Sequence, residues 1–315
     1  MSTRNSCDHG WRRSLLLAAI PALGTGCDVP SGEPTIDLGA IVTRSNTNTN
    51  TEGIWVNNGL GDPDISGIDP AHPLSSPQGM SQTEGVLADA ATRLAAVYLV
   101  ECALPLGSSM VKSVDGETIA LEGHVGLAPE WEDGACDEDC QQWVSACMLA
   151  RTNVNAQSIP ISLRADHPAL GFDGHPDFPI YEASFFGNLF VTPQGQYMCE
   201  GSDEGAIIAE LDGRTCSIDP ESCGFESYDD CEVAERCEIH GDDDEPTAID
   251  CVPEGSATTY RTISVYVMEA EDDGNGGGNG NEGGNGNGGG NGNGGGNGNG
   301  NGGGNGNGGG NGNGH

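Results

Sequence analysis

The sequence predicts an α+β fold in one disulfide-rich globular domain that spans residues 54–270. Helical periodicity occurs in the first half of this range, and runs of β-branched and aromatic residues follow in the second half. Ten of the 12 cysteines also lie within it. A segment of roughly 215 residues is long enough to bury one sizeable core.

The first predicted helix begins at Ser81-x-x-Glu84, a capping box in which the two end residues bond to each other's backbone N–H groups. An apolar stripe at helical spacing follows it. The stripe consists of Leu87, Ala91, Leu94, Tyr98 and Cys102. Pro105 and Gly107 end the helix, because proline cannot continue it and glycine favours a turn.

A β-hairpin is predicted next. Two strand-like runs, Met110–Val114 and Glu117–Leu121, flank the dipeptide Asp115-Gly116. Asp-Gly readily adopts the positive φ angles of a two-residue hairpin turn, so we expect the two runs to pair directly.

The second predicted helix has charges that suit the helix dipole. Acidic residues mark its start, and Arg151 marks its end. Those acidic residues are Asp133, Asp137, Glu138 and Asp139. Its predicted inner face is formed by Cys136, Cys140, Trp143, Cys147 and Ala150. Three cysteines on one stripe should join this helix to neighbouring segments, with Cys102 and Cys199 as candidate partners, although the sequence leaves the pairing open.

Three later segments are predicted to be strands because they are rich in β-branched or aromatic residues. They are Ile159–Leu163, Tyr181–Phe190 and Thr262–Met268. We therefore expect two helices and a hairpin first, and the remaining strands after them.

The part from residue 199 to 254 has a different composition. Between Cys199 and Cys251 it holds six cysteines and 18 acidic residues, with few large apolar side chains. Apolar burial alone cannot hold such a segment, so we expect disulfides to close it, each worth about 2–4 kcal/mol. A zinc site is the alternative, but it needs paired Cys-x2-4-Cys spacings, and only Cys136-x3-Cys140 approaches one. The ten predicted disulfide cysteines are Cys102, Cys136, Cys140, Cys147, Cys199, Cys216, Cys223, Cys231, Cys237 and Cys251.

The N-terminus has the layout of an export signal, predicted over residues 1–26. Arginines precede an apolar run from Leu15 to Leu23, which is shorter than the roughly 20 residues that span a membrane. Gly24-Thr25-Gly26 then precedes Cys27, as in the lipobox of bacterial lipoproteins, in which the cysteine is acylated. The alternative is ordinary cleavage after Gly26, which leaves Cys27 as an eleventh thiol with no obvious partner.

Acylation of Cys27 predicts an exported protein that is anchored in a membrane, at the periplasmic face or the cell surface. Residues 27–53 then form a polar tether, because this segment is short of large apolar side chains. Residues 271–315 are almost entirely glycine and asparagine, so they cannot form a core and are predicted to be a disordered tail.

The charge of the chain excludes some partners. It carries 11 basic and 48 acidic side chains, and Lys112 is its only lysine. Such a surface repels phosphate backbones and anionic lipids. We therefore expect no nucleic-acid binding, membrane contact through the acyl chain alone, and attraction for cations.

Four segments together resemble a family of uncharacterised secreted proteins and lipoproteins of myxobacteria. They are Tyr98–Pro105 (YLVECALP), Gly126–Trp131 (GLAPEW), Gln142–Asn153 (QWVSACMLARTN) and Phe185–Phe190 (FFGNLF). The resemblance covers most of residues 55–270. It implies export and carries no established activity or catalytic residues. The family often has several Asn-Gly-Leu repeats before the first segment, whereas Asn58-Gly59-Leu60 occurs once here.

A polar loop is the candidate metal site. Two imidazoles and three carboxylates fall within twelve residues there, and such side chains can hold a divalent cation or position a water. They are Asp166, His167, Asp173, His175 and Asp177. The ordinary interpretation is a polar loop without ligands. The chain has no Gly-x-Ser-x-Gly motif, and ten paired cysteines leave no free thiol. His124 could act as a base, but the sequence names no partner for it.

These observations predict an exported lipoprotein whose domain is a non-catalytic binding or structural module of the cell envelope. Its ligand is an unknown protein or envelope component, and no catalytic residue or cofactor is assigned. The alternative is a secreted, metal-assisted hydrolase that uses the loop from Asp166 to Asp177.

Overall fold

The computed structural model describes residues 53–269 except positions 212, 215, 229, 232–235 and 242–245. Within these residues the chain has an α+β fold with five disulfides, so the predicted fold class is confirmed. The predicted signal peptide, Cys27, the tether up to residue 52 and the tail from residue 271 lie outside the described residues.

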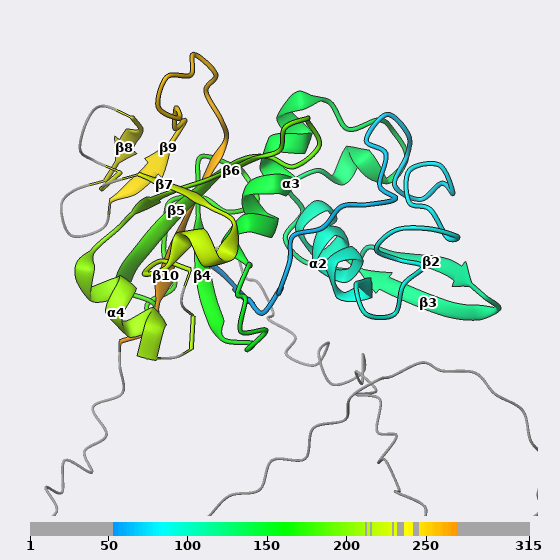
Figure 1. The fold of residues 1–315 in the computed structure, drawn as a ribbon, viewed down its shortest axis with the longest axis horizontal. Coiled ribbons are helices and arrows are strands. Elements are labelled where there is room, and N and C mark those ends of the chain that lie inside the picture. Colours follow the sequence, from blue (N-terminus) through cyan, green and yellow to red (C-terminus); the bar gives the residue numbers. More distant parts are fainter. Residues whose placement is uncertain are drawn as a thin grey trace, which may run out of the picture. The chain divides into compact units, whose positions relative to one another are not determined.

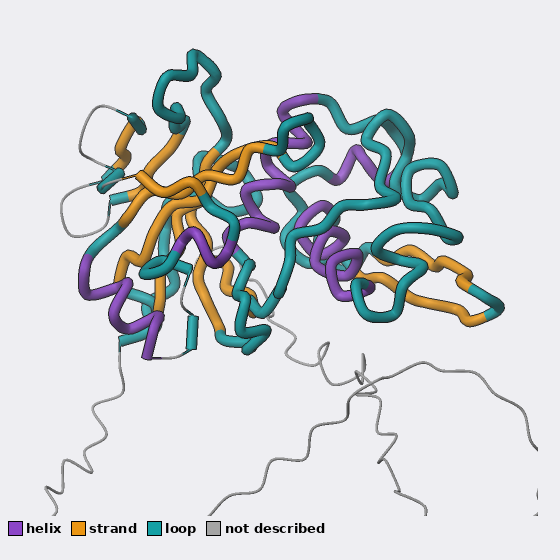
Figure 2. The backbone as a smooth tube through the Cα atoms, viewed as in Figure 1, coloured by secondary structure: helices purple, strands orange, loops and turns teal. Residues whose placement is uncertain are grey.

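The largest sheet of the fold has six strands and occupies one half of the domain (Figures 1 and 2). Its order is β1-β4-β10-β5-β6-β7, and every neighbouring pair is antiparallel except β6 and β7. The strands are β1 (Ile54–Asn57), β4 (Pro160–Arg164), β10 (Thr262–Val267), β5 (Ile180–Asn188), β6 (Gly195–Glu200) and β7 (Glu226–Tyr228). β4, β5 and β10 confirm the three predicted strands.

Both faces of this sheet are covered. The guanidinium carbon of Arg214 lies 5.1 Å from the ring centroid of Phe185 in β5, and Nη1 of Arg214 donates to the carbonyl of Ala150 in helix α3 (Glu138–Ala150). α3 therefore covers the Phe185 face. On the opposite face, the N–H of Ala248 in strand β9 (Thr247–Ile249) donates to Oγ of Ser264 in β10. Because both faces are covered, successive residues of β10 are all buried rather than alternately exposed.

Three helices are described: α2 (Arg93–Ala103), α3 (Glu138–Ala150) and α4 (Asp203–Leu211). α2 and α3 were predicted, and α4 was not. The predicted start of α2 at Ser81 is wrong. Gly85 has φ of +73°, and a Cβ there would lie 2.1 Å from the carbonyl oxygen of Ser66, so the chain makes a close turn at this point. The helix begins only at Arg93, and it ends before Pro105 as predicted.

The first turn of α3 is capped as its sequence predicts. The carboxylate of Asp137 accepts a hydrogen bond from the N–H of Cys140 at 3.0 Å, and Glu138 and Asp139 stand in the first turn. A short 3-10 helix, η1 (Pro129–Glu132), precedes α3, and a second, η2 (Pro220–Cys223), follows α4.

The predicted hairpin is confirmed as β2 (Ser109–Val114) and β3 (Glu117–Glu122). Asp115 and Gly116 both have positive φ, 49° and 85°, as a two-residue turn of this kind requires. Lys112 attaches the hairpin to the preceding loops, because its Nζ donates to the carbonyls of Leu74, Ser75 and Ser76 at 2.8, 2.9 and 2.9 Å.

The disulfides fall into two sets. In the first half of the domain, Cys102–Cys147 joins α2 to α3, and Cys136–Cys140 closes the first turn of α3. The acidic part contains Cys199–Cys231, Cys216–Cys223 and Cys237–Cys251, so its six cysteines pair among themselves. This pairing confirms that disulfides close the acidic part.

The expectation that three cysteines would tie α3 to neighbouring segments is wrong. Only Cys147 does so, with the predicted partner Cys102. Residues four apart at the start of a helix are near enough to pair, and the Cα atoms of Cys136 and Cys140 are 5.3 Å apart. Cys199 pairs with Cys231 and not with α3.

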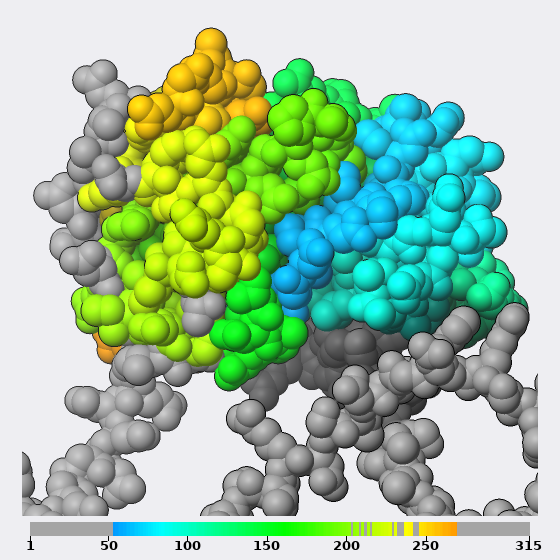
Figure 3. All heavy atoms as spheres, viewed as in Figure 1, coloured from blue at the N-terminus to red at the C-terminus, as the bar shows by residue number. Residues whose placement is uncertain are grey.

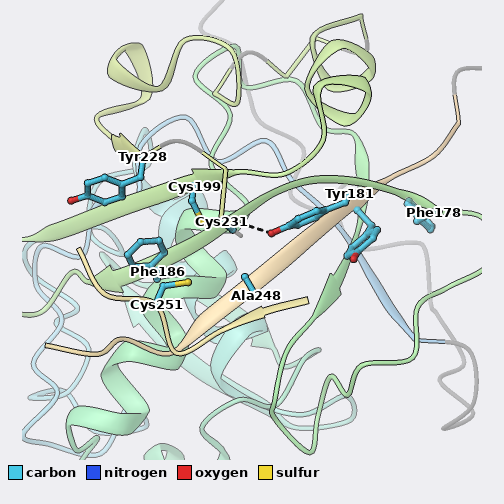
Figure 4. Close-up of a cluster of buried hydrophobic side chains, with 9 residues drawn as sticks. Phe178, Tyr181, Phe186, Cys199, Tyr228, Cys231, Ala248 and Cys251 are labelled. Carbon is cyan, nitrogen blue, oxygen red and sulfur yellow. Dashed lines mark hydrogen bonds between the residues drawn. A yellow bond between two sulfur atoms is a disulfide. The ribbon is translucent and has the colours of Figure 1, made fainter. Parts of the chain in front are cut away.

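A second core lies on the sheet face opposite α3 (Figure 4). It consists of Phe178, Tyr181, Phe186, Cys199, Tyr228, Cys231, Ala248, Cys251 and Tyr266. A two-stranded sheet of β8 (Glu238–His240) and β9 (Thr247–Ile249) accompanies it. In the space-filling view, the residues after about 225 (yellow to orange) lie at the opposite end from residues 60–120 (cyan) (Figure 3). Among the described residues, no helix has the length and apolar character that a membrane crossing requires.

Candidate functional site

The candidate site is a hollow of about 480 Å³ between the first turn of α3 and the loops before and after Cys251. We call it the acidic hollow. It is lined by Glu138, Asp139, Gln142, Asp250, Thr259 and Arg261. Three carboxylates face one guanidinium in this lining, so the hollow has an excess of negative charge.

Arg261 holds the two sides of the acidic hollow together. Its Nε lies 2.6 Å from Oδ1 of Asp139 on α3, and its Nη1 lies 3.1 Å from Oδ1 of Asp250. The hydrogen bond from Arg261 to Asp139 raises the pKa of the guanidinium. The backbone N–H of Arg261 also donates to Oε1 of Gln142 at 3.1 Å. One residue thus connects α3, the loop after β9 and the start of β10.

Disulfides flank both walls of the acidic hollow. Cys136–Cys140 closes the turn of α3 that carries Glu138 and Asp139. On the other wall, Asp250 precedes Cys251, which is bonded to Cys237. Asp250 has φ of +52°, a left-handed conformation that aspartate tolerates better than most residues. These constraints hold the backbone that carries the carboxylates on both walls.

Tyr260 lies in the chain between Thr259 and Arg261, which both line the acidic hollow. Its ring centroid lies 5.7 Å from that of Tyr197 in β6. Burial raises the pKa of Tyr260, and the charges of Tyr197 and Glu138 act in the same direction.

The predicted metal residues are engaged in separate local contacts. Nδ1 of His167 accepts the N–H of Ala169 at 3.1 Å, and its ring centroid lies 4.8 Å from that of Trp143. Nδ1 of His175 accepts the N–H of Asp177 at 3.2 Å, and its ring stands edge-on to Phe178. In both histidines Nδ1 is engaged by a neighbouring amide, so only Nε2 could bind a metal without breaking that hydrogen bond.

The loop does not assemble a ligand set. The ligand atoms of His175 and Asp177 are 3.8 Å apart, whereas Asp166 and Asp173 are exposed. Over the residues that the structure describes, only Cys199, Cys237 and Cys251 bring three possible ligand atoms within 4.8 Å of one another, and all three are in disulfides. The metal-assisted hydrolase stays a prediction without a supporting contact.

His124 lies next to Glu101 in the structure, a neighbour that the sequence did not predict. Its backbone N–H donates to the carbonyl of Glu101, and burial lowers the pKa of its imidazole while the charge of Glu101 opposes that shift. The carboxylate of Glu101 is itself engaged by Nη2 of Arg151 at 2.5 Å. Because the carboxylate of Glu101 is bound to Arg151, we interpret Glu101 and Arg151 as a structural ion pair rather than Glu101 and His124 as an acid–base pair.

Comparison with known proteins gave no match: no family model, no curated protein and no solved structure is similar to this chain. The acidic hollow was not predicted either. Glu138 and Asp139 were explained by the helix dipole alone, and Asp250, Thr259 and Arg261 were not singled out. The available signal was Arg261, a rare base at the border of a strongly acidic segment.

Proposed function

We propose that this chain is an exported lipoprotein whose domain is a non-catalytic binding module that takes a cationic group into the acidic hollow. The observation that carries this proposal is the lining of the hollow, in which Asp139 and Asp250 share the guanidinium of Arg261 and Glu138 adds a third carboxylate. Export and acylation at Cys27 rest on the sequence of the first 27 residues.

The charge of the lining selects the class of ligand. Arg261 pairs with Asp139 and Asp250, and Glu138 is the third carboxylate. A ligand amine or guanidinium can pair with Glu138 and share the other two carboxylates with Arg261. The overall charge of −37 adds a long-range attraction that speeds the encounter with a basic partner. A basic segment of an envelope protein has this chemistry.

Isothermal titration of the mature chain with a short oligolysine peptide tests this function. We expect binding that the double substitution Glu138→Gln/Asp250→Asn weakens about two- to thirtyfold, since an ion pair with a carboxylate as exposed as these is worth about 0.2–1 kcal/mol. Asp115→Asn/Glu122→Gln is the matched control, because it also removes two charges, both exposed on the hairpin, and keeps a residue that tolerates positive φ at position 115. Equal affinities in all three proteins would mean that the attraction is diffuse and that the hollow is no binding site.

The lipoprotein part has its own test. Mass spectrometry of the N-terminal peptide from native membranes should find acylated Cys27, and Cys27→Ser should release the protein into the soluble fraction. An unmodified Cys27 would overturn the anchor while leaving the acidic hollow untouched. Turnover of glycans, peptides or esters by the purified protein would overturn the non-catalytic assignment.

A further inference from the structure

Two disulfides of the acidic part touch each other. Sγ of Cys199, which is bonded to Cys231, lies 3.8 Å from Sγ of Cys237, which is bonded to Cys251. The sulfurs of Cys199, Cys237 and Cys251 all lie within 4.8 Å of one another. Figure 4 shows Cys199 and Cys231 close together, with the hydroxyl of Tyr181 directed at Cys231 and with Cys251 drawn beside Phe186. A distance of 3.8 Å is van der Waals contact between sulfurs, from which thiolate attack on a disulfide can begin.

We propose that these four cysteines form a thiol–disulfide exchange site, in which a dithiol reduces Cys237–Cys251 and the remaining disulfide then moves from Cys199–Cys231 to Cys199–Cys237. The proposal is independent of ligand binding in the acidic hollow. It rests on the contact between the two disulfides, on their unequal exposure and on a hydrogen bond to one of the sulfurs.

Exposure makes Cys237 the entry point. Cys199, Cys231 and Cys251 are fully buried, whereas Cys237 is partly exposed. A dithiol can therefore attack Sγ of Cys237 and expel the thiolate of Cys251. The second thiol of the reagent then displaces Cys237 from the mixed disulfide. The reagent leaves oxidised to a disulfide, and its two electrons and two protons remain on Cys237 and Cys251 as two thiols.

The second step needs no further electrons. The thiolate of Cys237 attacks Sγ of Cys199, forms the Cys199–Cys237 bond and expels Cys231. The hydroxyl of Tyr181 lies 3.1 Å from Sγ of Cys231 and donates to it, so it stabilises the leaving thiolate. Burial raises the pKa of Tyr181, which keeps the hydroxyl protonated as a donor. The products are one disulfide and the free thiols of Cys231 and Cys251.

A variant separates the second step from the first. Cys251→Ala leaves Cys237 as a thiol beside an intact Cys199–Cys231, so exchange requires no reductant. After rapid alkylation and peptide mapping, we expect a Cys199–Cys237 linkage with the alkyl group on Cys231. Cys223→Ala is the matched control, because it frees Cys216 in the same part of the chain; we expect alkylation of Cys216 alone. A native Cys199–Cys231 bond with only Cys237 alkylated, after hours at pH 8, would overturn the proposal.

The wild-type chain provides a second measurement that does not depend on the folding of a variant. Limiting dithiothreitol, followed by alkylation at intervals, should yield the Cys199–Cys237 linkage with Cys231 and Cys251 alkylated. Tyr181→Phe keeps the ring and removes the donor, and we expect it to slow the appearance of that linkage about three- to tenfold. Alkylation confined to Cys237 and Cys251, with Cys199–Cys231 intact throughout, contradicts the proposed exchange.

Discussion

Arg214 and Glu182 form an ion pair in which both side chains are completely buried, with 2.6 Å between Nε and Oε1. Nη1 of Arg214 also donates to the carbonyl of Ala150, and the hydroxyl of Ser217 donates to Oε1 of Glu182. The pair thus joins the end of α3, strand β5 and the segment after α4. Oε2 of Glu182 and Nη2 of Arg214 have no hydrogen-bond partner among the described residues.

Breaking this pair should destabilise the domain strongly. Arg214→Met leaves the Glu182 charge buried and alone, which costs about 3–5 kcal/mol. The double variant Arg214→Met/Glu182→Leu should lose much less than the sum of the single losses, because no buried charge remains. Unfolding in guanidinium chloride measures the free energy of unfolding of the wild type, the two single variants and the double variant. Arg236→Met, which removes an exposed pair with Glu254, should cost less than about 1 kcal/mol. Additive single losses would show that the buried charges are not coupled.

The two disulfides at α3 should contribute unequally to stability. Cys102–Cys147 spans 45 residues and Cys136–Cys140 spans four. Loop-closure entropy gives about 4 kcal/mol for the first and about 2 kcal/mol for the second. The free energy of unfolding should therefore fall further in Cys102→Ala/Cys147→Ala than in Cys136→Ala/Cys140→Ala. All four cysteines are buried, so packing losses are similar. The reverse order would rule out loop closure as the main term.

Lys112 should be a stabilising residue despite its burial. Lys112→Met keeps the apolar stem but leaves the carbonyls of Leu74, Ser75 and Ser76 without their shared donor. We expect a loss of about 1.5–3 kcal/mol, the usual range for bonds to a charged group. Val111→Thr, on the exposed face of the same strand, is the control and should change stability little. Thermal unfolding compares the two, and an unchanged midpoint for Lys112→Met contradicts the anchoring role.

Acid should destabilise the domain partly through His124. Burial holds the pKa of His124 below the ordinary value of 6.5 in the folded protein. The unfolded chain therefore binds this proton more readily, so the unfolding free energy falls as the pH drops below about 6.5. His124→Gln should reduce the slope of stability between pH 7 and 5. A residual slope is expected from His167, whose pKa burial also lowers. An unchanged slope in His124→Gln would remove this residue from the explanation.

Local patterns predicted the elements whose determinants lie close together in the chain. Asp115-Gly116 specified the hairpin turn, and Asp137 with Glu138 and Asp139 specified the start of α3. The same reasoning failed at Ser81 because the turn at Gly85 is imposed by Ser66, a residue distant in sequence. A capping box stabilises a helix only where the backbone after it is free to be helical.

The acidic part contains the elements that the sequence did not predict. Its composition predicted that disulfides would close it, and it did not predict α4 or the short strands β7, β8 and β9. Strands of three residues carry too few side chains to show the alternation of apolar and polar residues that predicts a strand. Here they are held by pairing with neighbouring strands and by disulfide cysteines that precede or follow them.

The sequence by itself determined the fold class, the hairpin, the second helix and the need for disulfides, because turn chemistry, helix capping and apolar content act over a few neighbouring residues. Only the tertiary structure decided which cysteines pair, that Arg261 joins Asp139 to Asp250, and that Cys199 touches Cys237. Arg261 lies 122 positions from Asp139 and 11 from Asp250, and Cys199 lies 38 positions from Cys237, so these contacts are set by how the sheet and α3 pack rather than by any local preference.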